Sequence, residues 1–121
     1  MKVYLSKINE SWIVDRIRDE WHDNNEEIST ENIYESDVIW IISPWLWEKI
    51  PKKLLKNKKV LCSLYHFEEK DFTRKALKNF YKRDAFVDHY HVISPKVKGQ
   101  LESLTTKPVT YIPFWVNQNI W

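Results

Sequence analysis

The sequence contains one glycine and one cysteine among 121 residues, and both scarcities limit what the chain can be. The glycine-rich turns that approach a dinucleotide pyrophosphate or cradle a nucleotide phosphate need several glycines, so both fingerprints are absent. Cys62 has no partner cysteine for a disulfide within the chain, which is typical of a reducing compartment. No apolar run approaches the roughly 20 residues that span a bilayer, and the start MKVYLSKINE lacks a signal-peptide pattern. We therefore expect a cytoplasmic protein.

Charge is also scarce in net terms, whereas aromatic residues are plentiful. A formal net charge of +2 is too small to indicate nucleic-acid binding. Apolar residues make up 43% of the chain, with seven Trp, six Tyr and five Phe, so a packed core can form. At this length we expect one domain that covers residues 1–121, without repeats or low-complexity segments.

Hydrophobic periodicity alternates between strand and helix patterns along the chain. It predicts strands at 2–5, 27–30, 37–43, 59–67, 90–94 and 109–113, and helices at 11–25, 71–83 and 95–104. The runs DVIWIIS and KVLCSLYHF are continuously apolar, as in parallel strands covered on both faces. The fold class is therefore α/β, with a doubly wound, mainly parallel, Rossmann-like sheet that has helices on both faces.

Ligands of such sheets bind beyond the carboxyl ends of the strands. The loops to inspect are 6–12, 43–47, 65–69 and 94–96. No nucleophile elbow and no zinc-type spacing of Cys and His occurs. His89 and His91 share one face of a strand, but no carboxylate or Cys is placed to complete a metal site, so we expect none.

The last quarter of the chain resembles a known family. The order of a strand HVIS, a basic helix and a strand that runs into YIPFWVN, with a final Trp121, resembles the end of the N-terminal domain of GT-B glycosyltransferases of family 4. Upstream, SDVIWIISPW and VLCSLYHF look like two earlier strands of that domain. The resemblance covers roughly residues 36–121.

The resemblance implies that this chain is the acceptor-side half of a nucleotide-sugar-dependent glycosyltransferase. Residues 113–121 would begin a linker toward a C-terminal domain, or toward a partner chain, that binds the nucleotide-sugar donor. This half alone would bind no cofactor and would be inactive. Its partner on the acceptor side would be a carbohydrate or a lipid-linked acceptor. A non-catalytic α/β binding module is the alternative.

The resemblance also suggests site residues. His66 matches the histidine of the family's "Hd" strand end, where it would hydrogen-bond sugar hydroxyls or polarise the reacting centre. The strand-end loops supply the candidate acceptor-binding residues Asn9, Trp12, Ser43, Trp45, Tyr65, Glu68 and Ser94. Structural roles are open for the same residues, because a Tyr-His-Phe run can pack a strand end and tryptophans often fill a core.

A basic and aromatic segment spans residues 45–59. Its lysines are Lys49, Lys52, Lys53, Lys56, Lys58 and Lys59. Such a segment can contact a polyanion or lie peripherally on an anionic membrane. The alternative is a crossover helix with its apolar residues on the sheet and its lysines in water, interrupted at Pro51.

Overall fold

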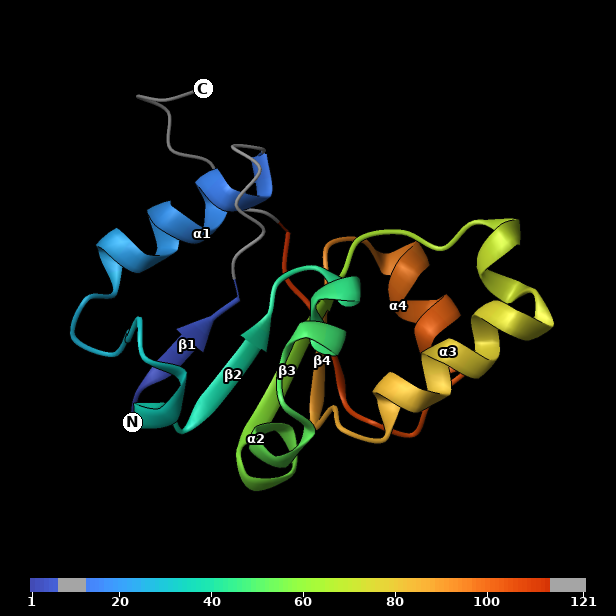
Figure 1. Ribbon diagram of the computed structural model, residues 1–121. Helices are drawn as coiled ribbons and strands as arrows, with labels where there is room; N and C mark the ends of the chain where they lie inside the picture. Colours follow the sequence, from blue (N-terminus) through green and yellow to red (C-terminus); the bar gives the residue numbers. More distant parts are fainter. Residues whose placement is uncertain (7–12, 114–121) are drawn as a thin grey trace.

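The computed structural model describes residues 1–6 and 13–113, and its centre is a parallel β-sheet (Figure 1). The strands lie side by side in chain order: β1 Val3–Leu5, β2 Val38–Ile41, β3 Lys59–Leu64, β4 His89–Val92 and β5 Val109–Tyr111. The helices are α1 Ile13–Asn24, α2 Lys52–Asn57, α3 Arg74–Asp84 and α4 Pro95–Glu102, with 3₁₀ turns η1 Ile33–Glu35, η2 Pro44–Lys49 and η3 Glu69–Phe72. The predicted α/β class with a parallel sheet is confirmed.

A short segment at Ser29 completes the winding of the sheet. It forms an isolated parallel bridge to Val3 on the edge of β1 that faces away from β2. The amide of Val3 donates to the carbonyl of Ile28 at 2.6 Å, and the amide of Thr30 donates to the carbonyl of Val3 at 3.0 Å. With this segment counted as the second strand, the spatial order is 2-1-3-4-5-6 in chain order, which is a doubly wound arrangement. The predicted strand at 27–30 is thus reduced to one bridge.

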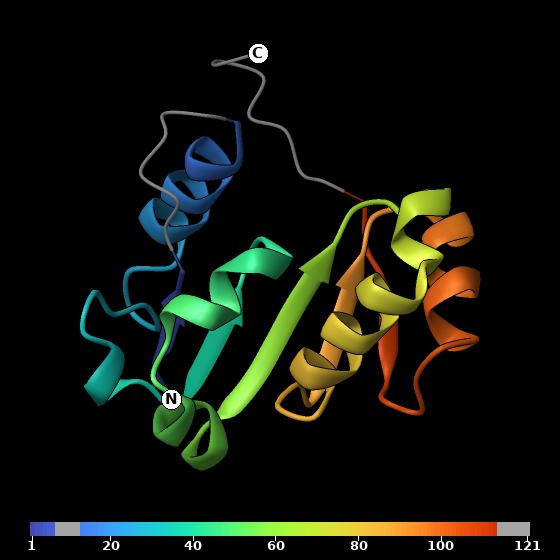
Figure 2. The same ribbon diagram turned by 45° about the vertical axis from the view of Figure 1, so that its right-hand side comes forward.

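The two faces of the sheet are covered by different helices (Figures 1 and 2). The register pairs Trp40 with Leu61 and Leu61 with His89, so these side chains share one face and Tyr90 lies on the other. On the first face, α1 places Trp21 edge-on against Trp40, with ring centroids 5.4 Å apart. On the second face, Phe80 of α3 stacks on Tyr90 at 6.2 Å.

The direction in which the chain crosses the sheet and the face on which it crosses change at the same point. The crossover through α1 moves toward the Ser29 edge on the first face, and the later crossovers move the opposite way on the second face. Reversing both the direction and the face preserves the hand of a crossover, so this arrangement satisfies the rule that parallel crossovers share one hand. The direction changes between β1 and β2.

Local signals set where helices begin. The side chain of Thr73 accepts a hydrogen bond from the amide of Ala76 at 3.2 Å, which starts α3 three residues later than periodicity predicts. Pro51 has no N–H to donate, and the segment at 45–59 is accordingly divided between η2 and the six-residue α2. Within the described ranges, no helix has the length and apolarity needed to cross a membrane.

Candidate functional site

A cavity of about 450 Å³ opens beside the carboxyl end of β3, on the second face of the sheet. Three segments form its walls: η2, the residues that follow β3, and α3. Its apolar lining consists mainly of Pro44, Trp47, Leu64, Phe67, Ala76 and Phe80, and its polar lining of Glu48, Tyr65, His66, Lys70, Asp71, Asn79 and Arg83. The volume lies within the range of small-molecule sites, which is about 300–1,000 Å³.

Two predicted site residues line this cavity. His66 is exposed at its edge, and its Nε2 lies 4.0 Å from a carboxylate oxygen of Glu68. Tyr65 is half-buried, and its hydroxyl donates to the carbonyl oxygen of Ile42. Burial raises the pKa of Tyr65 well above its ordinary value, so the phenol stays protonated at neutral pH. His66 is thus the better placed of the two for proton transfer or hydrogen bonding to a ligand.

The other predicted acceptor residues are not gathered around the cavity. Glu68 does not line the cavity, and its carboxylate pairs with Lys70 at 3.3 Å. The hydroxyl of Ser94 accepts the amide of Val97 at 3.2 Å, so Ser94 caps α4. Asn9, Trp12 and the side chain of Trp45 lie outside the described residues.

Ser43 is placed near the reversal point of the sheet, immediately beyond the end of β2. In doubly wound sheets ligands favour the crevice at such a point. There the hydroxyl of Ser6 accepts the amide of Ile42 at 3.0 Å. Ser43 itself is fully buried, and its hydroxyl has no hydrogen-bond partner in the described part of the chain.

Arg83 is a cavity residue that the sequence reasoning missed. It is only 9% exposed, and its guanidinium carbon lies 5.1 Å from the ring centroid of Phe80. Its Nε has no hydrogen-bond partner, and among the described residues no hydrogen bond or ion pair engages its guanidinium. A desolvated cation–π contact contributes about 2 kcal/mol, whereas burying an ion costs several kcal/mol even after relaxation. Phe80 alone therefore leaves this buried cation undercompensated.

A signal for Arg83 does exist in the sequence. Positions 76, 80 and 83 follow the i, i+4, i+7 spacing of one helix face. Ala76 and Phe80 form an apolar stripe on this helix, and Arg83 continues the same stripe. A charged residue on an apolar stripe indicates either an internal ion pair or a ligand contact.

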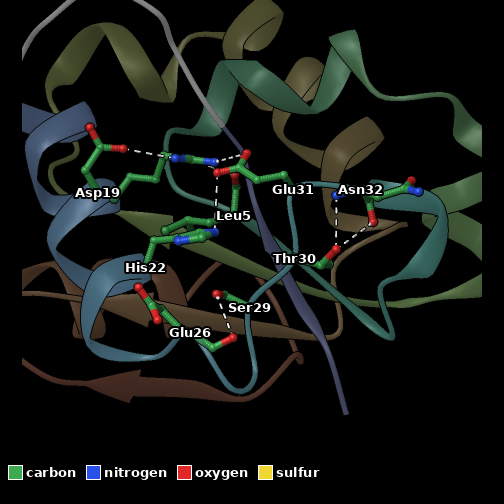
Figure 3. A network of polar contacts seen from close by, with 9 residues as sticks. Leu5, Asp19, His22, Glu26, Ser29, Thr30, Glu31 and Asn32 are labelled. Carbon is green, nitrogen blue, oxygen red and sulfur yellow. Dashed lines mark hydrogen bonds and ion pairs between the residues drawn. The ribbon is translucent and has the colours of Figure 1, made fainter.

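A second buried arginine lies on the other face of the sheet and is fully engaged (Figure 3). Arg18 of α1 donates through Nε to the carbonyl oxygen of Leu5 at 3.3 Å. Its two terminal nitrogens bind Asp19 at 3.0 Å and Glu31 at 2.9 Å. Glu31 also lies 3.3 Å from Nε2 of His22. This network ties α1 to the end of β1 and to the segment after Ser29.

A chain of buried polar side chains crosses the same first face. The indole of Trp40 donates to the hydroxyl of Ser63 at 2.8 Å, and that hydroxyl lies 2.8 Å from Nδ1 of His91. Nε2 of His91 lies 2.8 Å from the carbonyl oxygen of Ile112, which can only accept, so Nε2 must donate. A neutral His91 therefore satisfies every group in the chain. Burial lowers the pKa of His91, and the hydrogen bond to Ile112 opposes that shift in part.

The lysines of the basic segment are mostly exposed. Those exposed to solvent are Lys49, Lys52, Lys53, Lys56 and Lys59. Lys58 differs, because its ammonium group donates to the carbonyl oxygens of Tyr34 and Ser36. The apolar residues of the segment, including Leu46 and Leu55, are buried in the core. The sheet-facing arrangement expected of a crossover is thus present.

Comparisons of the chain with protein-family models, with curated proteins and with solved structures found no match. No group of three or more His, Cys, Asp or Glu side chains suited to a metal ion occurs within residues 1–6 and 13–113. The chemistry of the cavity and the motifs of the sequence are therefore the basis for inferring function.

Proposed function

We propose that this chain is the acceptor-binding half of a nucleotide-sugar-dependent glycosyltransferase of the GT-B type. The observation that carries the proposal is the position of His66, at the edge of a cavity beside the carboxyl end of a parallel strand. His66 is also the residue that matches the family's strand-end histidine. A doubly wound sheet favours ligands at this edge, which supports the same site.

The order of elements near the end of the chain supports the proposal as well. The resemblance rests on a strand, a serine, a basic helix and a strand that runs into Ile-Pro. These motifs correspond to β4, to the cap Ser94, to α4 and to β5 with Ile112 and Pro113 after it. The family-like pieces of sequence thus coincide with consecutive elements of one sheet.

The chemistry of the cavity suits an acceptor sugar. Trp47, Phe67 and Phe80 offer aromatic surface for a sugar ring, and His66 and Asn79 offer hydrogen-bonding groups for its hydroxyls. In glycosyl transfer, such a wall orients the acceptor hydroxyl and excludes water, while the donor is held from the other side. In our proposal the nucleotide-sugar is bound by a C-terminal donor domain or by a partner chain.

The test is turnover of UDP- and GDP-sugars by the isolated chain and by the same chain fused to a GT-B donor domain. We expect activity from the fusion alone. His66→Ala should lower transfer by the fusion about 10²-fold or more while folding is retained. The matched control is His89→Ala, which removes a partly buried histidine on the opposite side of the sheet from the cavity.

Other outcomes of this test would contradict parts of the proposal. Turnover by the isolated chain would mean that the donor site lies within it, and full activity of the His66→Ala fusion would remove His66 from the site. No turnover by either the isolated chain or the fusion would favour a non-catalytic α/β binding module that uses the same cavity.

The exposed lysines support a further part of the proposal, peripheral contact with an anionic membrane. A six-residue α2 is too short for a long amphipathic face, so contact would rest on charge. We expect sedimentation with vesicles that contain anionic lipid, and release as salt rises. Replacing Lys52, Lys53 and Lys56 with Gln should abolish it, and binding to neutral vesicles would contradict the role of the lysines.

A further inference from the structure

We propose that the cavity binds its ligand through an oxyanion, a phosphate ester or a carboxylate, held by the guanidinium group of Arg83. Arg83 lines the cavity and is more than nine-tenths buried. Its guanidinium lies over Phe80 but makes no hydrogen bond or ion pair within the described part of the chain. Among the described residues, the donors of Arg83 therefore meet no acceptor.

The chemistry of arginine specifies the missing partner. The guanidinium group stays charged in proteins and presents five N–H donors in a planar fork. Its strongest partners are carboxylate and phosphate oxygens, which it binds in pairs. A neutral hydroxyl would satisfy a donor but would leave the buried charge uncompensated, so an oxyanion is the better match.

The protein's own carboxylates near the cavity do not supply this partner. Asp71 accepts the amide of Glu68 at 2.8 Å, and Glu48 is exposed. Asp84, the neighbour of Arg83 in sequence, accepts the hydroxyls of Tyr90 at 2.6 Å and Thr105 at 2.8 Å through one oxygen. None of the three forms an ion pair with Arg83. Within the described part of the chain no carboxylate serves as the partner of Arg83, and we infer that a ligand supplies one.

The rest of the cavity indicates what accompanies the oxyanion. Lys70 adds a second cation to the lining, although Glu68 pairs with it at 3.3 Å. Trp47 and Phe67 supply aromatic walls for a flat or ring-shaped group. We therefore infer a small molecule that joins a ring to a phosphate or carboxylate. If the proposed function holds, on which this clause rests, the acceptor is an anionic sugar.

The experiment measures binding to the whole 121-residue chain by calorimetry at constant ionic strength. The probes are inorganic phosphate, glucose 6-phosphate, glucuronate and neutral glucose. We expect glucose 6-phosphate or glucuronate to bind at least tenfold more tightly than glucose. The phosphate and carboxylate arms identify which oxyanion the site prefers. Equal binding of all three sugars, or no binding by either anionic sugar, would overturn the inference.

Substitutions locate the site. Arg83→Met should weaken binding of the preferred anionic sugar tenfold or more, and Arg83→Lys, which keeps the charge but loses the fork, should weaken it less. Lys82→Met removes an exposed charge from the same turn of α3 and should leave binding unchanged. Because the lysine variant keeps a cation in place, it serves as the test if the methionine variant does not fold. Binding that both Arg83 variants retain in full would exclude Arg83.

Failure of this inference is distinguishable from failure of the proposed function. Glycosyl transfer by the fusion with no preference for anionic acceptors would overturn the oxyanion site and leave the transferase intact. Anion binding that depends on Arg83, without transfer, would do the reverse.

Discussion

The two buried arginines on opposite faces of this sheet are engaged in different ways. On the face beneath α1, Arg18 reaches a backbone carbonyl and two carboxylates, and Ser63 and His91 are joined in one hydrogen-bonded chain. On the face that carries the cavity, Tyr90 is paired with Asp84, but Arg83 is buried without a hydrogen-bond partner for its Nε among the described residues. Both arginines pack against the same sheet.

The contrast separates structural from functional burial. Buried polar groups in folded proteins are nearly always paired, because an unpaired one loses its hydration and gains nothing. Arg18 obeys this rule through the protein itself and ties three segments together. Arg83 has no such partner among the described residues. It lines a cavity, and a ligand bound there would supply the partner. The lack of a hydrogen-bond partner for Arg83 is therefore better explained by ligand binding than by a role in folding.

The largest effect should come from breaking the paired arginine. Arg18→Met leaves the carbonyl of Leu5 without its donor in a buried position, which costs about 1–3 kcal/mol. The two carboxylates contribute little to this loss, because Asp19 and Glu31 are exposed and water can solvate them. The free energy of unfolding should fall by about that amount in a urea titration.

Lys82→Met serves as the control for this substitution, since it removes an exposed charge elsewhere. Its effect should stay within about 0.5 kcal/mol. A loss of the same size in both variants would mean that Arg18 stabilises the fold only through its charge. The hydrogen bond of Arg18 would then not distinguish it from Arg83.

A smaller effect, which depends on pH, should come from His91. Its folded-state pKa lies below its ordinary value of 6.5, so between the two values the unfolded chain binds more protons than the folded one. Stability is therefore complete above about pH 6.5 and falls as the pH drops below it. Protonation would also make Nδ1 of His91 a donor toward the hydroxyl of Ser63, which already accepts from the indole of Trp40.

Urea titrations across this pH range should show a shallower fall for His91→Gln than for the unmodified chain. His89→Gln is the matched control, since it changes a partly exposed histidine two residues away on the same strand. An unchanged pH profile in the His91 variant would show that its protonation is not linked to folding.

Breaking the unpaired arginine should have little effect on folding. Arg83→Met loses a cation–π contact with Phe80 of about 2 kcal/mol at most, but it also removes a poorly compensated buried charge. The two changes oppose each other, so the free energy of unfolding without ligand should change by less than about 1 kcal/mol. A loss as large as that of Arg18→Met would indicate a structural role and remove the contrast between the faces.

Much of the fold could be predicted from sequence because its signals are local. The continuous apolar runs at 37–43 and 59–67 became β2 and β3, and the stripes at 11–25 and 71–83 became α1 and α3. Boundaries shifted where a cap or a proline decided, as at Thr73 and Pro51. The strand predicted at 27–30 is a single bridge, since few of its backbone groups find partners on β1.

The site was harder to predict because it depends on contacts between distant segments. His66 and Tyr65 could be proposed as strand-end residues, and they do line the cavity. Ser94 was proposed by the same rule, but it is a helix cap, because a serine before a helix serves either purpose. Arg83 lies eighteen residues after Tyr65, and its lack of a partner becomes visible only when the helix is packed against the sheet.

The smallest effect should come from Ser43, and a second serine makes the comparison sharp. Ser43 and Ser63 are both fully buried. Ser43 lies beyond the end of β2, and Ser63 lies within the neighbouring parallel strand β3. The hydroxyl of Ser63 joins Trp40 to His91, whereas the hydroxyl of Ser43 has no partner in the described residues. Ser63→Ala should therefore cost about 1–3 kcal/mol, since it removes the hydrogen bonds that the hydroxyl makes with Trp40 and His91.

Ser43→Ala removes a hydroxyl that makes no hydrogen bond, so the free energy of unfolding should stay within about 0.5 kcal/mol or rise slightly. Urea titrations of the two alanine variants under one condition give the difference directly. A loss of more than 1 kcal/mol in Ser43→Ala would mean that its hydroxyl has a partner in the folded protein, such as a buried water. Ser43 would then no longer resemble Arg83, whose Nε lacks a partner among the described residues.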